Sequence, residues 1–230
     1  MTKQALLAGL VLATLAGAVN AGDKFYDVTI TNMTRGQSFT PIAVVTHTDE
    51  ISLFTPGAPA IAEIVDVAES GNVAPLASLA ASLPELVGPV ATSEGLLGPG
   101  ETTTIRVGRE GRFDQISFVA MLIPTNDTFV AINTVAAPKG KDVLRLNAIA
   151  YDAGSEVNDE NCANIPGPVC GGVGLADDDG EGYVHVSGGI KGIDSLDPVD
   201  YDWRNPVASV TIVRAKGSDD GDDGDNDDKD

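Results

Sequence analysis

The stretch QISFVAMLIPTNDTFVAI, residues 115–132, decides the fold of this chain. Two short apolar segments, rich in β-branched and aromatic residues, flank the connection PTND, which is typical of two strands joined by a turn. A third segment of the same kind, VLRLNAIA, follows at 143–150. Because sequential strands are usually neighbours in space, these three segments predict an antiparallel meander.

The rest of the domain repeats this pattern of short strands. Five further segments alternate or run apolar between Gly, Pro, Asn and Asp residues, as strands do. They are FYDVTIT (25–31), FTPIAVVTH (39–47), TTTIRV (102–107), YVHVS (183–187) and VASVTIVR (207–214). About eight short strands in a domain of this length predict an all-β fold, either a β-sandwich or a barrel.

One insertion, residues 59–83, has helical rather than strand periodicity. Its apolar residues recur at intervals of three and four, at Ile61, Ile64, Val65, Ala68, Leu76, Leu79, Ala80 and Leu83. Pro59 and Pro75 suit the first turn of a helix, and Gly71 with Asn72 suits the stop between two helices. We therefore expect two short helices that cap the core rather than bind a ligand.

Acidic residues follow the meander strands at two points. Asp127 lies in the first connection, and the run YDAGSEVNDE at 151–160 places Asp152 and Glu156 directly after the third strand. The first and third strands of a meander run in the same direction, so their exits lie at the same end of the sandwich. Carboxylates that converge in turns are the ligands that a hard cation such as calcium prefers. The sequence therefore predicts a divalent-cation site there.

The two ends of the chain differ in composition from the domain. Residues 1–21 combine Lys3 with an apolar run, which predicts a secretory signal peptide cleaved before Gly22. Residues 217–230 are almost entirely Asp and Gly, which predicts a disordered acidic tail. The domain between them, 22–216, carries no apolar stretch that predicts a membrane span. The net charge of −20 argues against binding to nucleic acid.

Few other residues offer chemistry. Cys162 and Cys170 lie close together in an exported chain, which predicts a disulfide, and no His at ligand spacing supports a thiolate metal site instead. The two histidines, His47 and His185, lack a motif that marks a nucleophile, so we interpret both as structural. The acidic turn at 177–181 is interpreted as exposed, with a second calcium loop as its alternative.

Several of these segments together resemble the spondin domain, the N-terminal module of F-spondin and mindin, which also occurs in single-domain bacterial exported proteins. The resemblance extends from about Tyr26 to Val213. It rests on VTITNMTRGQSFTPIAVVTH (28–47), AESGN with PLASLAASLP (68–84), MLIPTNDTFVAIN (121–133), YDAGSEVNDE (151–160) and DWRNPVASVTI (202–212).

The resemblance implies an antiparallel β-sandwich similar to calcium- and lipid-binding domains. It also implies a divalent cation, calcium, held by carboxylates of two loops, which match Asp127, Asp152 and Glu156 here. This chain departs from animal members in two ways. Thr128 and Phe129 follow the first acid, where animal members have Trp, and Glu156 replaces a common Asp. Ligation is expected to survive both changes.

These observations predict a secreted or periplasmic binding or adhesion module, not an enzyme. Its expected partner is an unknown extracellular or envelope protein or glycan. A carboxylate-based hydrolase of an extracellular polysaccharide is an alternative, although an aromatic content of 5% leaves few rings to stack on a sugar. A structural envelope or surface component is a second alternative.

Overall fold

A computed structural model describes residues 24–176 and 180–215. The predicted signal peptide (1–21), most of the acidic turn at 177–181 and the predicted tail (217–230) lie outside these residues. The described chain forms ten strands: β1 (Lys24–Asn32), β2 (Ser38–Phe39), β3 (Ala43–His47), β4 (Val87–Thr92), β5 (Thr102–Arg109), β6 (Gln115–Ile123), β7 (Thr128–Ala136), β8 (Val143–Asp152), β9 (His185–Val186) and β10 (Ala208–Ala215).

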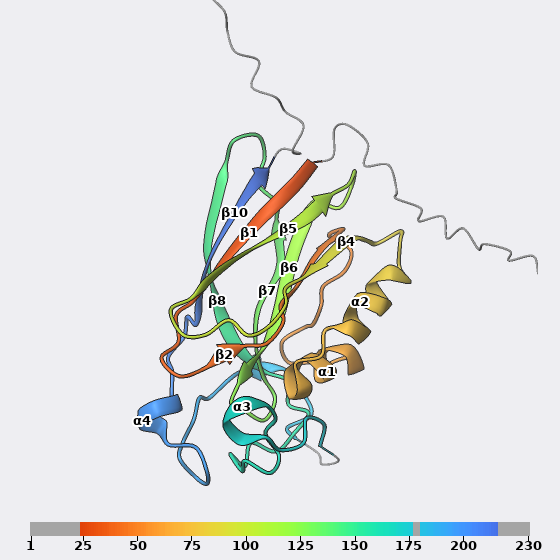
Figure 1. Ribbon diagram of the computed structural model, residues 1–230. Helices are drawn as coiled ribbons and strands as arrows, with labels where there is room; N and C mark the ends of the chain where they lie inside the picture. Colours follow the sequence, from red (N-terminus) through yellow and green to blue (C-terminus); the bar gives the residue numbers. More distant parts are fainter. Residues whose placement is uncertain (1–23, 177–179, 216–230) are drawn as a thin grey trace, which may run out of the picture.

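All the strand pairs are antiparallel, and the main path runs β4-β3-β6-β7-β8-β10-β1-β5. This order confirms the predicted meander, because β6, β7 and β8 are consecutive in both sequence and space. It also confirms the all-β sandwich. β1 and β10 share one buried core with β6 and β7, and Figure 1 shows how these strands are arranged.

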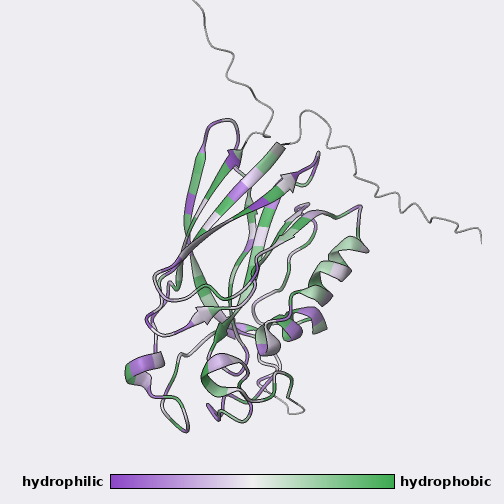
Figure 2. Ribbon diagram, in the orientation of Figure 1, coloured by the Kyte–Doolittle hydropathy of each residue, from purple (hydrophilic) through white to green (hydrophobic). Residues whose placement is uncertain are grey.

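Burial differs between the two halves of the sandwich, and the sequence pattern follows this difference. Along β10 and β8, buried residues alternate with more exposed ones, and hydrophobic and hydrophilic colours alternate in Figure 2. Along β6, every residue after Gln115 is buried. One face of β6 contributes Phe118 to the core between the two halves, and the other contributes Val119 to a second core. A strand covered on both faces has a continuous apolar run.

The second core lies beneath the two predicted helices, which are confirmed as α1 (Ala62–Ser70) and α2 (Ala74–Ala81). Ile64 and Leu76 belong to this core, in which α1 packs on β6 and β7 and α2 packs on α1 and β4. Pro75 lies in the first turn of α2, where its missing N–H costs no hydrogen bond. Gly71 ends α1 with a φ of 69°, a left-handed conformation that glycine adopts without strain.

Two strand predictions were wrong in detail, and one strand was missed. The segment predicted as one strand at 39–47 is interrupted, because Pro41 has no N–H to donate and lies between β2 and β3. The predicted strand 183–187 is reduced to the two residues of β9. Strand β4 was not predicted, since Gly88 and Pro89 are rare within strands. They are accommodated here because β4 begins the sheet path and therefore lies at an edge.

The long connection between β8 and β10 gathers at one end of the sandwich, which we call the loop end (residues 124–127 and 153–207, as far as described). It contains two short helices, α3 (Gly167–Cys170) and α4 (Pro198–Tyr201). The predicted disulfide is confirmed between Cys162 and Cys170. Among the described residues, no helix has the length and apolar character needed to cross a membrane.

Candidate metal centre

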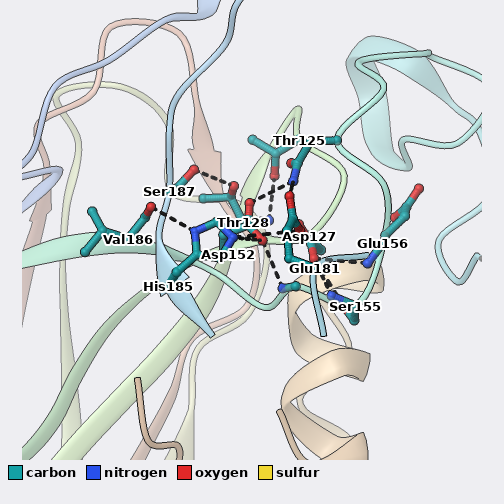
Figure 3. Close-up of polar contacts among 12 residues, drawn as sticks. Thr125, Asp127, Thr128, Asp152, Ser155, Glu156, Glu181, His185, Val186 and Ser187 are labelled. Atoms are coloured by element: carbon teal, nitrogen blue, oxygen red, sulfur yellow. Dashed lines mark hydrogen bonds and ion pairs between the residues drawn. The ribbon is translucent and has the colours of Figure 1, made fainter. Parts of the chain in front are cut away.

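Asp127 and Asp152 lie at neighbouring strand ends. Thr128 begins β7 and pairs directly with Asp152, the last residue of β8. Asp127 immediately precedes this pair, and its carbonyl accepts a hydrogen bond from the N–H of Ala153 at 3.1 Å. The antiparallel pairing of β7 with β8 thus brings the two predicted acids together, as the meander predicts (Figure 3).

The Asp127 carboxylate is fully buried and only half satisfied. Its Oδ2 accepts hydrogen bonds from the backbone N–H groups of Ser155 at 2.8 Å and Glu156 at 3.2 Å. Its Oδ1 has no hydrogen-bond partner among the described residues. Burial, together with the charge of Asp152, raises the pKa of Asp127 from 3.8 to about 8, despite the two N–H donors. A buried acceptor without a donor is costly, and a bound ion or water would supply the missing partner.

Asp152 is also buried, but both of its oxygens have partners. Oδ1 accepts from the N–H of Gly154 at 2.9 Å, and Oδ2 accepts from the side-chain amide of Asn158 at 2.9 Å. His185 Nε2 lies 3.4 Å from Oδ1. Burial raises the pKa of Asp152, and the Gly154 N–H and His185 act in the opposite direction. Among the described residues, no Lys or Arg forms an ion pair with Asp127 or Asp152.

Glu156, the third predicted ligand, is buried in the same loop. It contacts Asp127 through its backbone N–H, while its carboxylate accepts a hydrogen bond from the Asn126 side-chain amide at 2.9 Å. Asn126 also donates to Asp159 at 3.0 Å and accepts from the N–H of Glu160 at 3.1 Å. Asn126 thus fastens the acidic loop to the β6–β7 connection. Ligation by Glu156 stays a prediction.

Glu181, expected in an exposed acidic turn, and His185, expected to be structural, join Asp152. One ligand atom from each of the three lies within 4.8 Å of the others, which forms the one such His, Cys, Asp and Glu group in residues 24–176 and 180–215. Asp152 faces His185 in the β8–β9 pair. The i, i+4 spacing of Glu181 and His185 was a possible signal, but their approach to Asp152 depends on long-range pairing.

His185 is partly exposed, and its environment is acidic. Partial burial lowers its pKa. The hydrogen bond to the Val186 carbonyl and the charges of Asp152 and Glu181 outweigh that effect, so the pKa of His185 is raised overall. His47, by contrast, is fully buried between the carbonyl of Thr48 and the hydroxyl of Ser117. The structural interpretation therefore holds for His47, whereas His185 belongs to the candidate site.

Gly154 allows the two halves of the site to pack closely. Its φ is 65°, and a Cβ atom there would lie 2.3 Å from the carbonyl oxygen of Tyr183. Its own carbonyl accepts from the N–H of Gly182 at 2.7 Å. Only glycine fits both the left-handed backbone and this close approach. The segment carrying Glu181 and His185 can therefore lie directly against the acidic loop.

A polar pocket of about 140 Å³ opens beside these residues. Asp152, Glu181 and His185 line one part of it, and Lys191 and Trp203 line another. The pocket is bordered by a loop that the Glu160 carboxylate holds through the N–H groups of residues 191–193, at 2.6–2.9 Å. The candidate metal centre is thus connected to solvent by a cavity large enough for an ion and several waters.

Comparison with known proteins gives one family. Comparison with curated proteins gives no match to the chain. The family model described as Spondin_N matches residues 28–159, which include Asp127, Asp152 and Glu156 and end before Glu181. This family is one of non-enzymatic, extracellular modules of the binding or adhesion type. With more than half of its length matched by the family model, this chain belongs to the spondin N-terminal domain family.

Proposed function

We propose that this protein is an exported binding module whose loop end holds a divalent cation and uses it to engage an extracellular or envelope partner. The observation that carries the proposal is the pair of buried carboxylates, Asp127 and Asp152, at adjacent strand ends. Their mutual repulsion, and the unpartnered Oδ1 of Asp127, are both relieved by a bound cation.

Calcium is the first cation to test. Carboxylate oxygens suit calcium, and extracellular calcium modules often bind it with dissociation constants of about 0.1–1 mM. The Asp127–Asp152 adjacency supports these two residues as ligands, and Glu156 is the proposed third. The Asn126 contact to Glu156 then serves to position that carboxylate.

We propose that the protein is exported and that it is not an enzyme. We propose a signal peptide at 1–21, a mature domain at 22–216 and a tail at 217–230. Intact-mass measurement of the exported protein tests cleavage before Gly22.

The pocket beside the site is lined by one large aromatic side chain, Trp203. A polysaccharide hydrolase requires more stacking surface than this, which disfavours the enzymatic alternative.

The test of the cation is thermal unfolding of the full exported chain in a chelator and in millimolar calcium. A ligand that binds only the folded state stabilises it by about 2.7 kcal/mol at a hundredfold excess over the dissociation constant. We expect a clear rise in Tm for the native protein and little or none for Asp152→Asn. Asp142→Asn is the matched control, because Asp142 is exposed and lies just before the opposite end of β8.

An equal response of the native protein and Asp152→Asn would place cation binding elsewhere in the chain. The partner is tested separately, by binding envelope fractions of the source to immobilised protein with and without chelator. Chelator-sensitive capture that Asp152→Asn loses supports a cation-dependent binding module. Capture that is indifferent to chelator and to Asp152→Asn contradicts it.

A further inference from the structure

The group formed by Asp152, Glu181 and His185 contains a nitrogen ligand. His185 Nε2 lies 3.4 Å from Asp152 Oδ1 and 3.7 Å from Glu181 Oε2. A tetrahedral zinc ion with metal–ligand distances of 2.0–2.2 Å places its ligand atoms about 3.3–3.6 Å apart. The first separation lies in this range and the second just above it, and the Asp152 and Glu181 oxygens lie within 4.8 Å of each other. Movement of the exposed Glu181 side chain would bring all three atoms to zinc-binding distances.

The His185 ring is oriented as a metal ligand should be. Its Nδ1 contacts the carbonyl oxygen of Val186 at 3.1 Å, which fixes Nδ1 as the donor. Nε2 is thereby directed at Asp152 and Glu181 (Figure 3). Metal-binding histidines characteristically donate their other ring N–H to a backbone carbonyl or carboxylate.

The two carboxylates of the group also accept hydrogen bonds from neighbouring residues outside it. The side-chain amide of Asn158 donates to Asp152 Oδ2 at 2.9 Å and approaches Glu181 Oε1 at 3.5 Å. The Gly154 N–H donates to Asp152 Oδ1. Supporting hydrogen bonds of this kind orient metal ligands and raise affinity. Next to the group lies the buried, unpartnered Oδ1 of Asp127, whose charge interacts with Asp152.

We infer that the loop end binds a cation of the zinc class through Asp152, Glu181 and His185, with Asn158 as a positioning residue. The inference rests on the proposed function, since it names the cation of the same loop end. Calcium takes oxygen ligands, whereas imidazole nitrogen suits zinc and its neighbours in the transition series. Glu181 and His185 both lie beyond residues 28–159, so the family match does not supply them.

Three protein ligands leave the fourth position of a tetrahedral ion open. The ligand group lines the 140 Å³ pocket, so this position faces a route for the ion and for an outside ligand. An open zinc site with three protein ligands binds a water or a group from another molecule. A carboxylate or imidazole of a partner would therefore coordinate the ion at this fourth position.

The chain has two histidines, and this allows a direct test. The full chain, labelled with ¹⁵N and freed of metal by chelator, is titrated with zinc while the imidazole nitrogens are followed by NMR. We expect one equivalent of zinc to shift the Nε2 signal of His185 strongly. The signals of His47, which is enclosed by Thr48 and Ser117, serve as the internal control and should not move. The Asp-rich segment 217–230 contains no histidine, so zinc bound there is silent.

Variants supply an independent measurement by chelator competition. His185→Asn and Glu181→Gln should each weaken zinc binding at least about tenfold, and Asn158→Ala should weaken it about 10- to 100-fold, as loss of a supporting partner typically does. His47→Gln should leave the zinc affinity unchanged if it folds. Cobalt substitution adds a readout, since a histidine-containing tetrahedral site gives a visible absorption band that His185→Asn should lose.

The outcomes separate this inference from the proposed function. Zinc that leaves the His185 signals in place, or binds His185→Asn with native affinity, overturns the inference. If calcium nevertheless stabilises the native chain and not Asp152→Asn, the proposed function stands without it. If neither cation changes the Tm or the His185 signals, both are wrong, and the group is a His–carboxylate ion pair.

Discussion

Asp152 and His185 face each other across the β8–β9 pair, with 3.4 Å between Asp152 Oδ1 and His185 Nε2, although they are far apart in the sequence. Asp127 lies on the other side of Asp152, immediately before β7. Asp152 is therefore shared between an all-oxygen group on one side and a nitrogen-containing group on the other. The two groups lead to different cations and to separate predictions.

The pH dependence of the cation-free protein should reveal Asp127. Its pKa is raised to about 8 by burial and by Asp152, from 3.8. The folded state therefore keeps a proton that the unfolded state loses. The stabilising contribution is complete below about pH 4 and is lost as the pH rises through about 8. In chelator, Asp127→Asn should lose less stability than the native protein between pH 5 and pH 8, measured by urea unfolding. An equal loss in both proteins contradicts the predicted titration of Asp127.

Glu156→Gln should weaken the response to calcium while preserving the fold. Glutamine keeps a side-chain oxygen that can accept the hydrogen bond from Asn126, but it removes the negative charge. In chelator we expect its Tm to equal or exceed that of the native protein, because one of the repelling carboxylates is gone. Calorimetric titration with calcium compares the affinity of the variant with that of the native protein. Native affinity in the variant would mean that Glu156 is not a ligand.

Gly154→Ala should be strongly destabilising and should weaken cation binding. The added Cβ meets the Tyr183 carbonyl oxygen at 2.3 Å in a left-handed backbone. Gly140→Ala is the matched control, because Gly140 has a φ of 58° and open space around its Cβ position. The control should lose about 1 kcal/mol from backbone strain alone. Chemical denaturation of both variants measures the difference, and equal losses would exclude a role for the close approach to Tyr183.

Removal of the Cys162–Cys170 disulfide should lower stability without unfolding the sandwich. By the loop-entropy model, the loss is about 2–3 kcal/mol for a loop this short. The bridge closes a loop that follows the acidic run, so we also expect a modest loss of cation affinity. The double variant Cys162→Ser and Cys170→Ser is compared with the native protein by urea unfolding and by cation titration. Unchanged stability would show that the bridge adds no constraint.

The sequence by itself determined the strand meander and the acids at its exits. The apolar run of 115–123 and the alternation of 143–150 are local patterns, and Asp127 and Asp152 follow these strands directly. The two helices and the disulfide were predictable for the same reason. Strand β4 was not, because Gly88 and Pro89 oppose a strand locally and are tolerated only at an edge of the sheet.

Only the tertiary structure decided which side chains complete the candidate site. Glu181 and His185 come from a segment whose strand, β9, has just two residues and too weak a pattern to predict its pairing. The side chain of Asn126 was likewise unremarkable in the sequence, yet it fastens the acidic loop through Glu156 and Asp159. Local periodicity reports which face of a strand is buried. Contacts between loops depend on how those strands stack, which no local pattern records.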